Sequence, residues 1–592
     1  MTDPHQLLKS VFGFDSFRGV QEDVVSRVLA GRHTLAVMPT GAGKSLCYQL
    51  PALAREGTAL VVSPLIALMH DQIRSADALG IRAASLTSAD DRQAVTTRAL
   101  NGELDLLYVA PERATTDHFR RLAERLPLSL IAIDEAHCVS EWGHDFRPDY
   151  RQLKSLLDDH AEVPRLALTA TADRRTRADI LQQLGLPEDG LIVAGFDRPN
   201  IRYVIRPREG TAKQLKDLLR DRPGPAIVYT PSRDKAEKIA ETLAGLGRPA
   251  RPYHAGLPPE VRARNQAAFV ASEEMAMAAT VAFGMGIDKP DVRTVAHVAI
   301  SKSIESYYQE TGRAGRDGEP AEAWLFWSAS DFALARQRLE EECPPERRES
   351  ERERLNALAV LVETPGCRRA VLLRHFGEDP PATCGNCDNC LEPPAQRDAT
   401  EVARKLLSAV FRTEMRFGVG HLADVLAGKE TDKVHANGHH RLSVFGICTG
   451  EELPLVRPVA RALVARDALR ADPYGGLSFG PGAKPILKGE EPVRIAVPPP
   501  AKRRRRGGDD HPADPLFDAL RETRRALAAE QGVPPYVVFH DSTLREIAAA
   551  RPASRAALAR VQGVGEAKLQ RYGDAMLETV RQAGGDSAAS LS

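Results

Sequence analysis

Two short segments carry residue types that bind phosphate and a divalent cation. Gly41–Ser45, which reads Gly-Ala-Gly-Lys-Ser, follows the apolar run Thr34–Val37 and opens a helical pattern. In that order the amides of a glycine loop can turn toward phosphates, a lysine can reach the β- and γ-phosphates, and a serine hydroxyl can ligate Mg²⁺. The usual pattern has glycine where this sequence has Met38, so only the core of the motif is present. A glycine-rich turn with an exposed lysine is the alternative interpretation.

An acidic pair ends a second apolar run. Leu130–Ile133 leads directly into Asp134 and Glu135. Carboxylates at the C-terminal end of a buried strand can hold Mg²⁺ and orient an attacking water, although taken alone they could form a solvated rim. We expect Asp134 to hold the cation and Glu135 to polarise the water. Together the two segments predict an ATP site whose nucleotide and Mg²⁺ contacts come from Thr40, Gly41, Gly43, Lys44, Ser45 and Asp134.

An ATP-hydrolysing site also needs a positive charge at the γ-phosphate, and two arginines in a glycine-rich segment could supply it. Gln309–Gly318 contains Arg313 and Arg316. A guanidinium stabilises the negative charge that spreads over the γ-phosphoryl oxygens in the transition state. This segment lies in a separate predicted lobe, so it can complete the site only when the lobes close; surface salt bridges are the alternative role. The predicted catalytic residues are Lys44, Asp134, Glu135, Arg313 and Arg316.

Alternating strands and helices must position these residues. Short apolar runs bounded by polar residues are typical of strands buried on both faces, and amphipathic stretches such as Val20–Ala30 and Leu68–Leu79 separate them. This order predicts a parallel sheet covered by helices, which pauses near Gly195–Asn200 and restarts as a second lobe. The predicted strands are Thr34–Met38, Ala59–Val62, Leu106–Val109, Leu130–Ile133 and Leu166–Leu168, then Ala226–Tyr229, Thr294–Val298 and Trp324–Trp327.

Length and composition indicate a multidomain globular protein. The 592 residues are too many for one core, and 43% hydrophobic with 27% charged residues is an ordinary globular mix. Lys plus Arg (80) equals Asp plus Glu (80), so a nucleic-acid surface must come from local patches. The sequence has no basic start followed by an apolar stretch and no run of about eighteen apolar residues, so we expect neither a signal peptide nor a membrane span.

Four of the eight cysteines have the spacing of metal ligands. Cys384, Cys387 and Cys390 form a tight knuckle, and Cys367 precedes them. Four thiolates favour a closed tetrahedral Zn²⁺ site with a structural role. Disulfides are rare in a reducing compartment, whereas the spacing leaves an iron–sulfur cluster open as an alternative. We predict one structural Zn²⁺.

Several blocks, in order along the chain, resemble the RecQ family of DNA helicases in superfamily 2. The blocks are 14–21, 38–48, 63–68, 108–113, 134–150, 168–172, 196–200, 282–288 and 306–318. The resemblance implies two α/β RecA-like lobes, a helical zinc-binding platform, a winged helix and a small all-α HRDC domain, and it favours zinc as the metal. The predicted boundaries are 1–197 and 198–340 for the lobes, 341–398 for the platform, 399–497 for the winged helix, 498–514 for a basic linker and 515–585 for the HRDC domain.

The resemblance also implies contacts to the nucleotide. Phe14, Arg18 and Gln21 match the family's adenine clamp, in which the ring stacks on the base and the amide reads its edge. Without the resemblance, Phe14 would be interpreted as a core residue. Further nucleotide-binding residues implied in this way are Gly286, Asp288 and Gln309.

The segment after the acidic pair resembles the family's aromatic-rich loop. Trp142 and Phe146 would stack on bases, and Arg147 would meet phosphate or an aromatic face. His137 would link this loop to the nucleotide site. Packing of the two aromatic rings within the lobe is the alternative.

Two C-terminal modules would add DNA contacts. The winged helix is expected to place a hairpin near Asp472–Phe479, with Tyr474 at its tip. In the HRDC domain Tyr536 and Lys568 are candidate contacts, and Gly563–Gly565 resembles a turn whose amides could meet a phosphate. A tyrosine that packs and a helical bundle used for protein contacts are the alternatives.

The resemblance implies an ATP-dependent 3′-to-5′ helicase that translocates on single-stranded DNA. It would unwind duplex and branched DNA in recombination, repair, replication and the SOS response. An RNA helicase or remodeller on the same motor and an ATP-gated DNA clamp are the alternatives. We expect a monomer in the cytoplasm, associated with the nucleoid. Besides DNA, the candidate partners are a single-strand DNA-binding protein, a recombinase or a topoisomerase.

Overall fold

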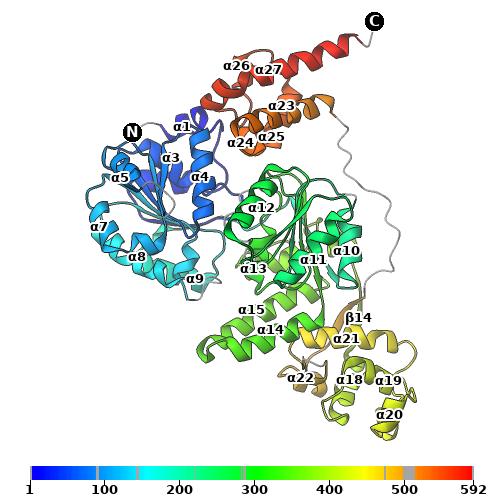
Figure 1. The fold of residues 1–592 in the computed structure, drawn as a ribbon. Helices are drawn as coiled ribbons and strands as arrows, with labels where there is room; N and C mark the ends of the chain where they lie inside the picture. Colours follow the sequence, from blue (N-terminus) through cyan, green and yellow to red (C-terminus); the bar gives the residue numbers. More distant parts are fainter. Residues whose placement is uncertain are drawn as a thin grey trace.

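The molecule is built from two α/β lobes, a helical extension and a C-terminal bundle. The computed structural model describes residues 3–87, 92–141, 146–220, 222–281, 283, 289–472, 475–497 and 514–589. The two lobes lie side by side, and a set of helices with a small domain extends from one end of the second lobe (Figure 1). The C-terminal bundle lies at the opposite end, against both lobes. The predicted pair of parallel α/β lobes is confirmed.

The first lobe has a seven-stranded parallel sheet with strand order β3-β4-β2-β5-β6-β1-β7. Its central strands are buried on both faces, which is why they appear in the sequence as short continuous apolar runs. The apolar pattern does not predict β3, with its alanines and serine, or β7, which is partly exposed at the sheet edge. The strands are β1 (Thr34–Val37), β2 (Thr58–Val62), β3 (Ala83–Leu86), β4 (Leu106–Val109), β5 (Leu128–Ile133), β6 (Arg165–Thr169) and β7 (Leu191–Val193).

Helices separate these strands along the chain and cover the sheet (Figure 1). The amphipathic stretches predicted at 20–30 and 68–79 correspond to α2 and α4. The helices are α1 (Pro4–Ser10), α2 (Gln21–Leu29), α3 (Leu46–Ala54), α4 (Ile66–Ala78), α5 (Arg92–Leu100), α6 (Pro111–Ala114), α7 (Asp117–Ala123), α8 (Pro148–Asp159) and α9 (Arg174–Leu184), with 3₁₀ turns η1 (Ala136–Val139) and η2 (Glu188–Gly190).

The second lobe repeats this plan with a six-stranded parallel sheet in the order β10-β11-β9-β12-β13-β8. The apolar pattern misses β8, β10 and β11, because arginine and proline interrupt β8 and β10, and β11 consists of alanines and one methionine. The strands are β8 (Ile201–Pro207), β9 (Ala226–Tyr229), β10 (Ala250–Tyr253), β11 (Ala276–Ala279), β12 (Thr294–His297) and β13 (Ala321–Trp327). The helices are α10 (Thr211–Leu219), α11 (Arg233–Ala244), α12 (Pro259–Ala271) and α13 (Ile304–Thr311).

A helical hairpin leads from the second lobe to the cysteine cluster. It consists of α14 (Ala329–Glu342), which starts at a capping box of Ser328 and Asp331, and α15 (Pro345–Glu363). The predicted boundary at 340/341 falls inside α14, close to its end. Two further helices flank the cysteines, α16 (Arg368–His375) and α17 (Asp388–Leu391).

The small domain beyond the cysteines carries the hairpin that the sequence predicts. Strands β15 (Leu469–Ala471) and β16 (Leu477–Phe479) pair antiparallel, and β14 (Ala395–Asp398) pairs with β17 (Arg494–Val497) to close the domain. Tyr474, predicted for the tip of the wing, lies outside the described residues. The helices are α18 (Thr400–Arg412), α19 (Val419–Leu426), α20 (Asp432–Ala436), α21 (Leu453–Ala465) and α22 (Ala483–Lys488), with 3₁₀ turn η3 (His439–Arg441).

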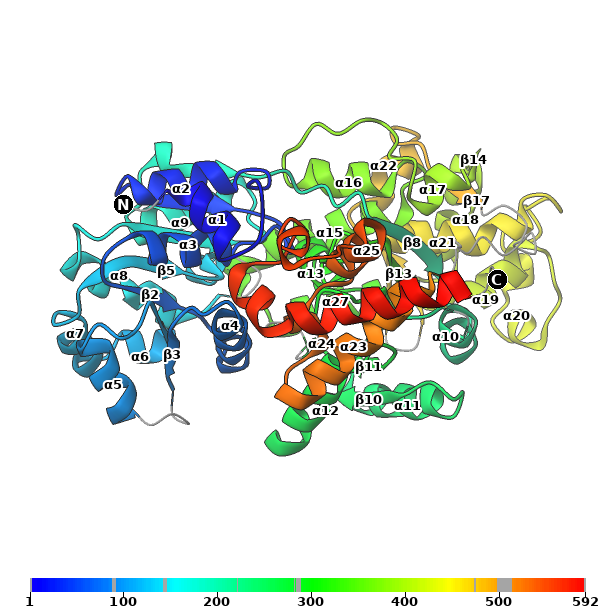
Figure 2. The same ribbon diagram turned by 90° about the horizontal axis from the view of Figure 1, so that it is seen from above.

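The C-terminal bundle packs around its own apolar core and also touches both lobes. Gly563 N donates to Gly13 O of the first lobe at 2.8 Å, and Arg524 Nη2 donates to Glu273 Oε1 of the second at 2.7 Å. Seen from above, α27 lies across the second lobe (Figure 2). The helices are α23 (Pro515–Gln531), α24 (Pro535–Val538), α25 (Asp541–Ala550), α26 (Arg555–Leu558) and α27 (Glu566–Ala589). In the described part of the chain, no helix has the length and apolar character needed to cross a membrane.

Candidate active site

The phosphate loop leaves the sheet at the end of β1 and enters α3. Gly41 and Gly43 both have positive φ, 87° and 74°, a conformation that glycine adopts without strain. A Cβ atom on Gly43 would lie 2.5 Å from Gln21 Nε2, so a larger residue would clash there. Lys44 Nζ donates to Met38 O at 3.3 Å, and Ser45 stands at the start of α3. The predicted phosphate ligands therefore lie in one loop.

Met38 shows why the first glycine of the usual pattern is dispensable. Its side chain is buried in the core of the lobe, and its backbone N donates to Thr169 O at 2.9 Å, which extends the pairing of β1 with β6. Met38 thus continues the pairing at the C-terminal end of β1, and the turn of the phosphate loop begins after it. Among the described residues the buried Thr40 Oγ1 has no hydrogen-bond partner, as expected of a group that a ligand would satisfy.

The acidic pair directly follows β5. Glu135 N donates to Asp134 Oδ1 at 2.9 Å, and Tyr150 OH donates to Asp134 O at 2.9 Å, so both residues are held firmly. Glu135 has a φ of 49°, an uncommon value for a residue with a side chain. Burial, and then the charge of Glu135, raise the pKa of Asp134, whereas the charge of Lys44 lowers it. A divalent cation at this position would favour the ionised carboxylate.

His137 connects Glu135 to the end of β6. Its Nδ1 lies 3.3 Å from Glu135 Oε2 and 3.0 Å from Thr169 Oγ1, and its side chain is fully buried. Burial alone would lower the pKa of His137, but Cys138 and Glu135 raise it to about 10. The contact of Nδ1 with Glu135 Oε2 can hold this carboxylate in place. Thr169 lies in the block 168–172, to which the sequence assigns no role; its contact with His137 follows from its place at the end of β6.

The predicted adenine clamp lies beside the phosphate loop. The Arg18 guanidinium lies 5.3 Å from the centre of the Phe14 ring. Both ends of the Gln21 amide are hydrogen-bonded: Oε1 accepts from Arg18 N at 2.8 Å, and Nε2 donates to Ala42 O at 2.9 Å. Gln21 thus supports the phosphate loop directly, and its contact with a base stays a prediction.

Arg316 lies across the lobe interface from the phosphate loop. A Cβ atom on Gly41 would be 3.4 Å from Arg316 Cα and 3.5 Å from Arg316 Cγ. Arg313 is buried instead within the second lobe, where it lies near Tyr229 of β9. Gln309 lies on α13, two residues before that helix ends at Thr311. The structure brings Arg316 to the phosphate loop, whereas Gly286 and Asp288 lie outside the described residues.

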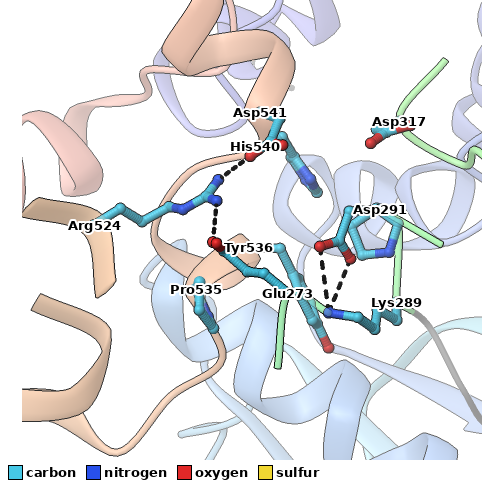
Figure 3. A pocket seen from close by; sticks show the side chains of 10 residues that line it. Glu273, Lys289, Asp291, Asp317, Arg524, Pro535, Tyr536, His540 and Asp541 are labelled. Carbon is cyan, nitrogen blue, oxygen red and sulfur yellow. Dashed lines mark hydrogen bonds and ion pairs between the residues drawn. The ribbon is translucent and has the colours of Figure 1, made fainter. Parts of the chain in front are cut away.

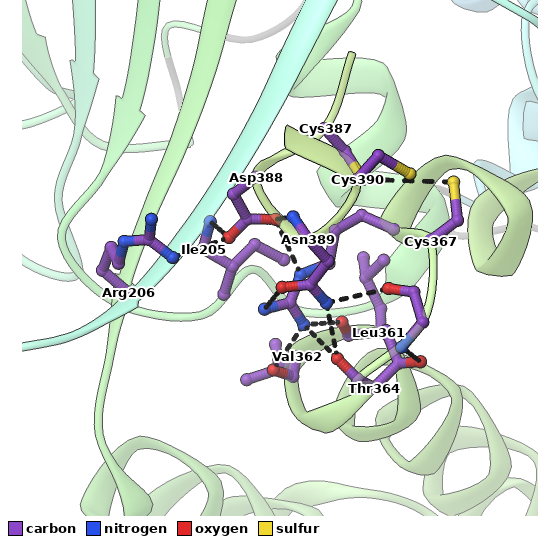
Figure 4. Close-up of polar contacts among 12 residues, drawn as sticks. Ile205, Arg206, Leu361, Val362, Thr364, Cys367, Cys387, Asp388, Asn389 and Cys390 are labelled. Carbon is purple, nitrogen blue, oxygen red and sulfur yellow. Dashed lines mark hydrogen bonds and ion pairs between the residues drawn. The ribbon is translucent and has the colours of Figure 1, made fainter. Parts of the chain in front are cut away.

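The four cysteine sulfurs are arranged as a metal site. The Sγ atoms of Cys367, Cys384, Cys387 and Cys390 all lie within 4.8 Å of one another, with Cys384 and Cys390 3.9 Å apart and Cys367 and Cys387 4.0 Å apart. Zn–S bonds of about 2.3 Å in a tetrahedron give S–S distances of about 3.8 Å, so the cluster fits Zn²⁺. Figure 4 shows three of these cysteines, Cys367, Cys387 and Cys390, beside a polar network.

The network in Figure 4 anchors the cysteine knuckle to the second lobe. The buried carboxylate of Asp388 accepts from Ile205 N at 3.0 Å and from Arg206 Nη1 at 3.1 Å on β8, and from Arg368 Nε at 3.2 Å on α16. Asn389 Nδ2 donates to Thr364 O at 2.8 Å. A metal in the knuckle would therefore fix the end of β8 as well as its own loop.

The predicted DNA contacts of the aromatic-rich loop are described only in part. Trp142 lies outside the described residues. The Phe146 ring has the Arg151 guanidinium 5.2 Å from its centre, and Arg147 Nη1 donates to Pro64 O at 3.1 Å. Arg147 thus braces the loop after β2 in this conformation, and its role on DNA stays a prediction.

The candidate DNA contacts of the C-terminal bundle are engaged within the molecule. The Tyr536 ring lies 5.9 Å from Lys289 Nζ and lines a pocket between the bundle and the second lobe (Figure 3). Lys568 Nζ lies 5.5 Å from the centre of the Phe539 ring, and burial lowers the Lys568 pKa to about 8. The turn with Gly563 donates to a protein carbonyl instead of a phosphate.

Five protein families match successive parts of the chain. They are DEAD/DEAH box helicase (residues 18–180), helicase conserved C-terminal domain (210–318), RecQ zinc-binding (329–391), RQC domain (393–504) and HRDC domain (513–580). With the two parallel-sheet lobes, these matches confirm the predicted fold class, including the zinc-binding, winged-helix and HRDC parts.

Two relatives match the chain over almost its whole length. The chain is 42% identical over 590 residues to the ATP-dependent DNA helicase RecQ of Haemophilus influenzae, with 97% of this chain and 95% of that protein covered. It is 38% identical over 584 residues to the protein of the same name from Bacillus subtilis, with 97% and 98% covered. The DEAD/DEAH region and the four-cysteine site confirm ATP with Mg²⁺ and one structural Zn²⁺ as the cofactors. The chain belongs to the RecQ family and is an ATP-dependent DNA helicase.

Proposed function

We propose that this helicase moves 3′ to 5′ along single-stranded DNA and separates duplex and branched DNA ahead of it. The observation that carries the proposal is the position of Arg316, which lies in the second lobe beside Gly41 of the first. ATP bound between these groups would hold the lobes together, and hydrolysis would release them. Lobes that grip the strand alternately then convert each ATP into a step.

Separate residues carry the parts of this cycle. Lys44 holds the β- and γ-phosphates, Ser45 and Asp134 hold Mg²⁺, and Glu135 orients the attacking water. Arg316 stabilises the charge on the γ-phosphoryl group as its bond to the ADP oxygen breaks. The buried position of Arg313 supports a second task for that residue, namely to hold the arginine loop against β9.

His137 and the loop that follows it couple DNA to hydrolysis in this proposal. His137 contacts Glu135, and Arg147 N donates to Cys138 O at 2.9 Å, so a short covalent and hydrogen-bonded path joins the water-orienting acid to the aromatic-rich loop. Bases stacked on Trp142 and Phe146 would change the position of this loop. Trp142→Ala should then fold normally but lose the stimulation of ATP hydrolysis by DNA.

Strand separation on tailed duplexes tests the proposed activity and its direction. DNA duplexes with a 3′ tail, with a 5′ tail and with none are incubated with ATP and Mg²⁺, and a matched set is made of RNA. We expect unwinding of the 3′-tailed DNA alone, and none by Lys44→Ala. Unwinding of 5′-tailed DNA would reverse the polarity, and equal unwinding of RNA would support an RNA helicase. ATP-dependent DNA binding without hydrolysis or strand separation would support an ATP-gated DNA clamp.

The setting of this activity follows from its substrate. Chromosomal DNA would place the helicase in the cytoplasm at the nucleoid, where it acts in recombination, repair, replication and the SOS response. A single-strand DNA-binding protein, a recombinase or a topoisomerase would handle the strands that it releases. We expect it to act as a monomer, since both halves of the nucleotide site come from one chain.

A further inference from the structure

The segment that joins the two lobes carries an arginine that reaches both halves of the nucleotide site. Residues 194–200 run from β7 of the first lobe to β8 of the second. The Arg198 guanidinium donates from Nη1 to Thr40 O, in the phosphate loop. It also donates to three carbonyls of the arginine loop: from Nη1 to Gly312 O at 3.1 Å, and from Nη2 to Ala314 O at 2.9 Å and Gly315 O at 2.8 Å.

The two loops that Arg198 joins are already in van der Waals contact. A Cβ atom on Gly312 would lie 3.4 Å from Thr40 Cβ, and one on Gly41 would lie 3.4 Å from Arg198 Nη1. Residues 312–315 connect α13 to Arg316, so their carbonyls fix the direction in which Arg316 leaves the loop. A single side chain therefore sets the distance between the phosphate loop and the backbone that presents Arg316.

The zinc platform holds the joining segment in place. Arg369 Nη2, on α16, donates to Ile201 O at 2.7 Å and Arg198 O at 3.1 Å. Asn386 Nδ2, in the cysteine knuckle, donates to Pro199 O at 3.0 Å. Glu378 accepts from Phe196 N. The backbone on either side of Arg198 is thus fixed by elements outside the two lobes.

The chemistry of the contacts requires arginine. The planar guanidinium presents several N–H donors in a rigid fork, which can satisfy four carbonyl oxygens at once, whereas a lysine ammonium is a compact donor on a flexible stem. Burial lowers the pKa of the Arg198 guanidinium, but arginine stays charged at neutral pH. Carbonyl oxygens are neutral acceptors, so salt weakens this bridge much less than it would an exposed ion pair.

We propose that Arg198 is a positioning residue for ATP hydrolysis, which aligns the arginine loop with the phosphate loop across the lobe interface. Its four hydrogen bonds are to protein carbonyls, so it would act through Arg316 and not on the nucleotide itself. The inference rests on the proposed role of Arg316 in the same chain. It adds that the alignment is built into the joining segment and anchored by the zinc platform.

Steady-state kinetics of two variants at Arg198 and a matched control test this. Asn200→Ala is the control, because Asn200 Nδ2 donates to Gly315 O at 2.8 Å and Glu319 O at 2.9 Å within the second lobe and does not reach the phosphate loop. Hydrolysis is measured at saturating single-stranded DNA over a range of ATP concentrations. Affinities for ADP and for ADP with beryllium fluoride, which occupies the γ-phosphate position, are measured alongside.

We expect kcat to fall about 100-fold in Arg198→Ala and about tenfold in Arg198→Lys, since small misplacements of catalytic groups have effects of this size. The KM for ATP and the affinity for ADP should stay within about threefold, whereas tight binding of ADP with beryllium fluoride should be lost. Asn200→Ala should lose much less than either variant.

Several outcomes separate this inference from its alternatives. Zinc content and thermal unfolding show whether each variant is folded. If Arg198→Ala does not fold, the test rests on Arg198→Lys, which keeps the charge and the approximate length of the side chain. A kcat within twofold of wild type in folded Arg198→Lys would overturn the inference. So would an equal loss in Asn200→Ala, since the bond to Thr40 O would then be irrelevant. Absence of hydrolysis in the wild type would instead refute the proposed function.

Discussion

The interface between the two lobes and the interface between the C-terminal bundle and the second lobe are both held by arginines, but their acceptors differ. Arg198 donates to four neutral backbone carbonyls. At the bundle, Arg521, Arg524 and Arg525 converge on the single carboxylate of Glu273. A bridge of neutral acceptors persists as salt and pH change, whereas a bridge on one carboxylate can be opened by either. The bridge to neutral carbonyls suits an interface that must align the two lobes under all conditions. The bridge to one carboxylate suits an interface from which the C-terminal bundle can detach.

Glu273 is the centre of the bundle interface (Figure 3). Its side chain is 7% exposed and accepts from Arg521 at 2.6 Å and Arg524 at 2.7 Å. Arg524 also donates to Phe539 O at 2.8 Å and pairs with Asp541 at 2.6 Å, so the carboxylate grips the core of the bundle. At the other end, a Cβ on Gly13 would lie 2.6 Å from Gly565 N, so the bundle also fits closely on the first lobe.

The largest expected effect lies at the lobe interface. Arg316→Ala should lower kcat for DNA-stimulated ATP hydrolysis about 10³-fold, because an arginine at the γ-phosphate contributes about 10³-fold or more to phosphoryl transfer in GTPases. Arg313→Ala should lower the unfolding temperature, because it removes a buried side chain near Tyr229, and should reduce kcat of the folded protein less. Steady-state kinetics and thermal unfolding of both variants provide the comparison. A larger kcat loss in folded Arg313→Ala would reverse the two roles.

Zinc should matter to the lobe interface and not to the bundle. Cys387→Ser removes a ligand of the buried cluster, and loss of the metal frees the knuckle that holds Pro199 O and β8. We expect loss of bound zinc, a lower unfolding temperature and a fall of about 10- to 100-fold in kcat for ATP hydrolysis. Cys343→Ser is the control, since Cys343 lies outside the cluster. Full activity of zinc-free protein would contradict the account.

Glu273→Ala should release the bundle without stopping the motor. Removal of one partner from a buried ion pair costs about 3–5 kcal/mol. Arg524 carries most of this effect, because Arg525 is 53% exposed and screened by solvent. Small-angle X-ray scattering should show a larger radius of gyration, while kcat for ATP hydrolysis stays close to wild type. The neighbouring exposed Glu274→Ala is the control, and an unchanged radius in Glu273→Ala would show that contacts such as Gly13 with Gly565 suffice.

The smallest effect should be a gradual response of the same interface to pH and salt. Burial alone would raise the pKa of Glu273, but Arg525, Arg521 and Arg524 lower it below the ordinary 4.5. Docking lowers the pKa of this carboxylate, so the ionised carboxylate stabilises the docked state at pH values above 4.5. This stabilisation is lost as the pH falls below 4.5 toward the lowered pKa, where the carboxylate becomes protonated in the docked state too. Asp541 also has a lowered pKa, but its partner Arg524 lies in the same bundle, so this pair stays intact when the bundle undocks.

The scattering experiment can follow this response directly. The radius of gyration of the wild type should increase below pH 4.5 and, to a lesser degree, at high salt, provided that the far-ultraviolet circular dichroism is unchanged. Glu273→Ala should already have the larger radius at neutral pH. A wild-type radius that is constant across this range would argue that apolar packing holds the bundle.

Sequence patterns predict the features of this molecule that are determined by residues close together in the chain. The apolar runs before Gly41 and Asp134 predict strands because both faces of those strands are buried. The cysteine spacing predicts the metal site for a similar reason, since three of its ligands share one knuckle. Strand β11 escapes prediction because its alanines carry no apolar signature strong enough to mark a core strand.

Sequence patterns do not predict contacts between segments that are far apart in the chain. Nothing in the residue type of Gln21 shows that its amide supports the phosphate loop, and nothing in Arg198 shows that it reaches Thr40. Tyr536 and Lys568 have the right chemistry for DNA, yet in this conformation one lines the bundle interface and the other lies over Phe539. Which of several suitable partners a side chain meets is decided by packing of the whole fold.

One chain supplies both halves of the nucleotide site in this structure, and a mixture of two inactive variants tests whether it does so during hydrolysis. Lys44→Ala lacks the phosphate-binding lysine but keeps Arg316, and Arg316→Ala is the reverse. ATP hydrolysis is measured with single-stranded DNA for each variant alone and for an equimolar mixture. The account predicts that the mixture hydrolyses ATP no faster than the sum of its parts. Recovery of activity in the mixture would show that Arg316 acts on a neighbouring molecule and would contradict it.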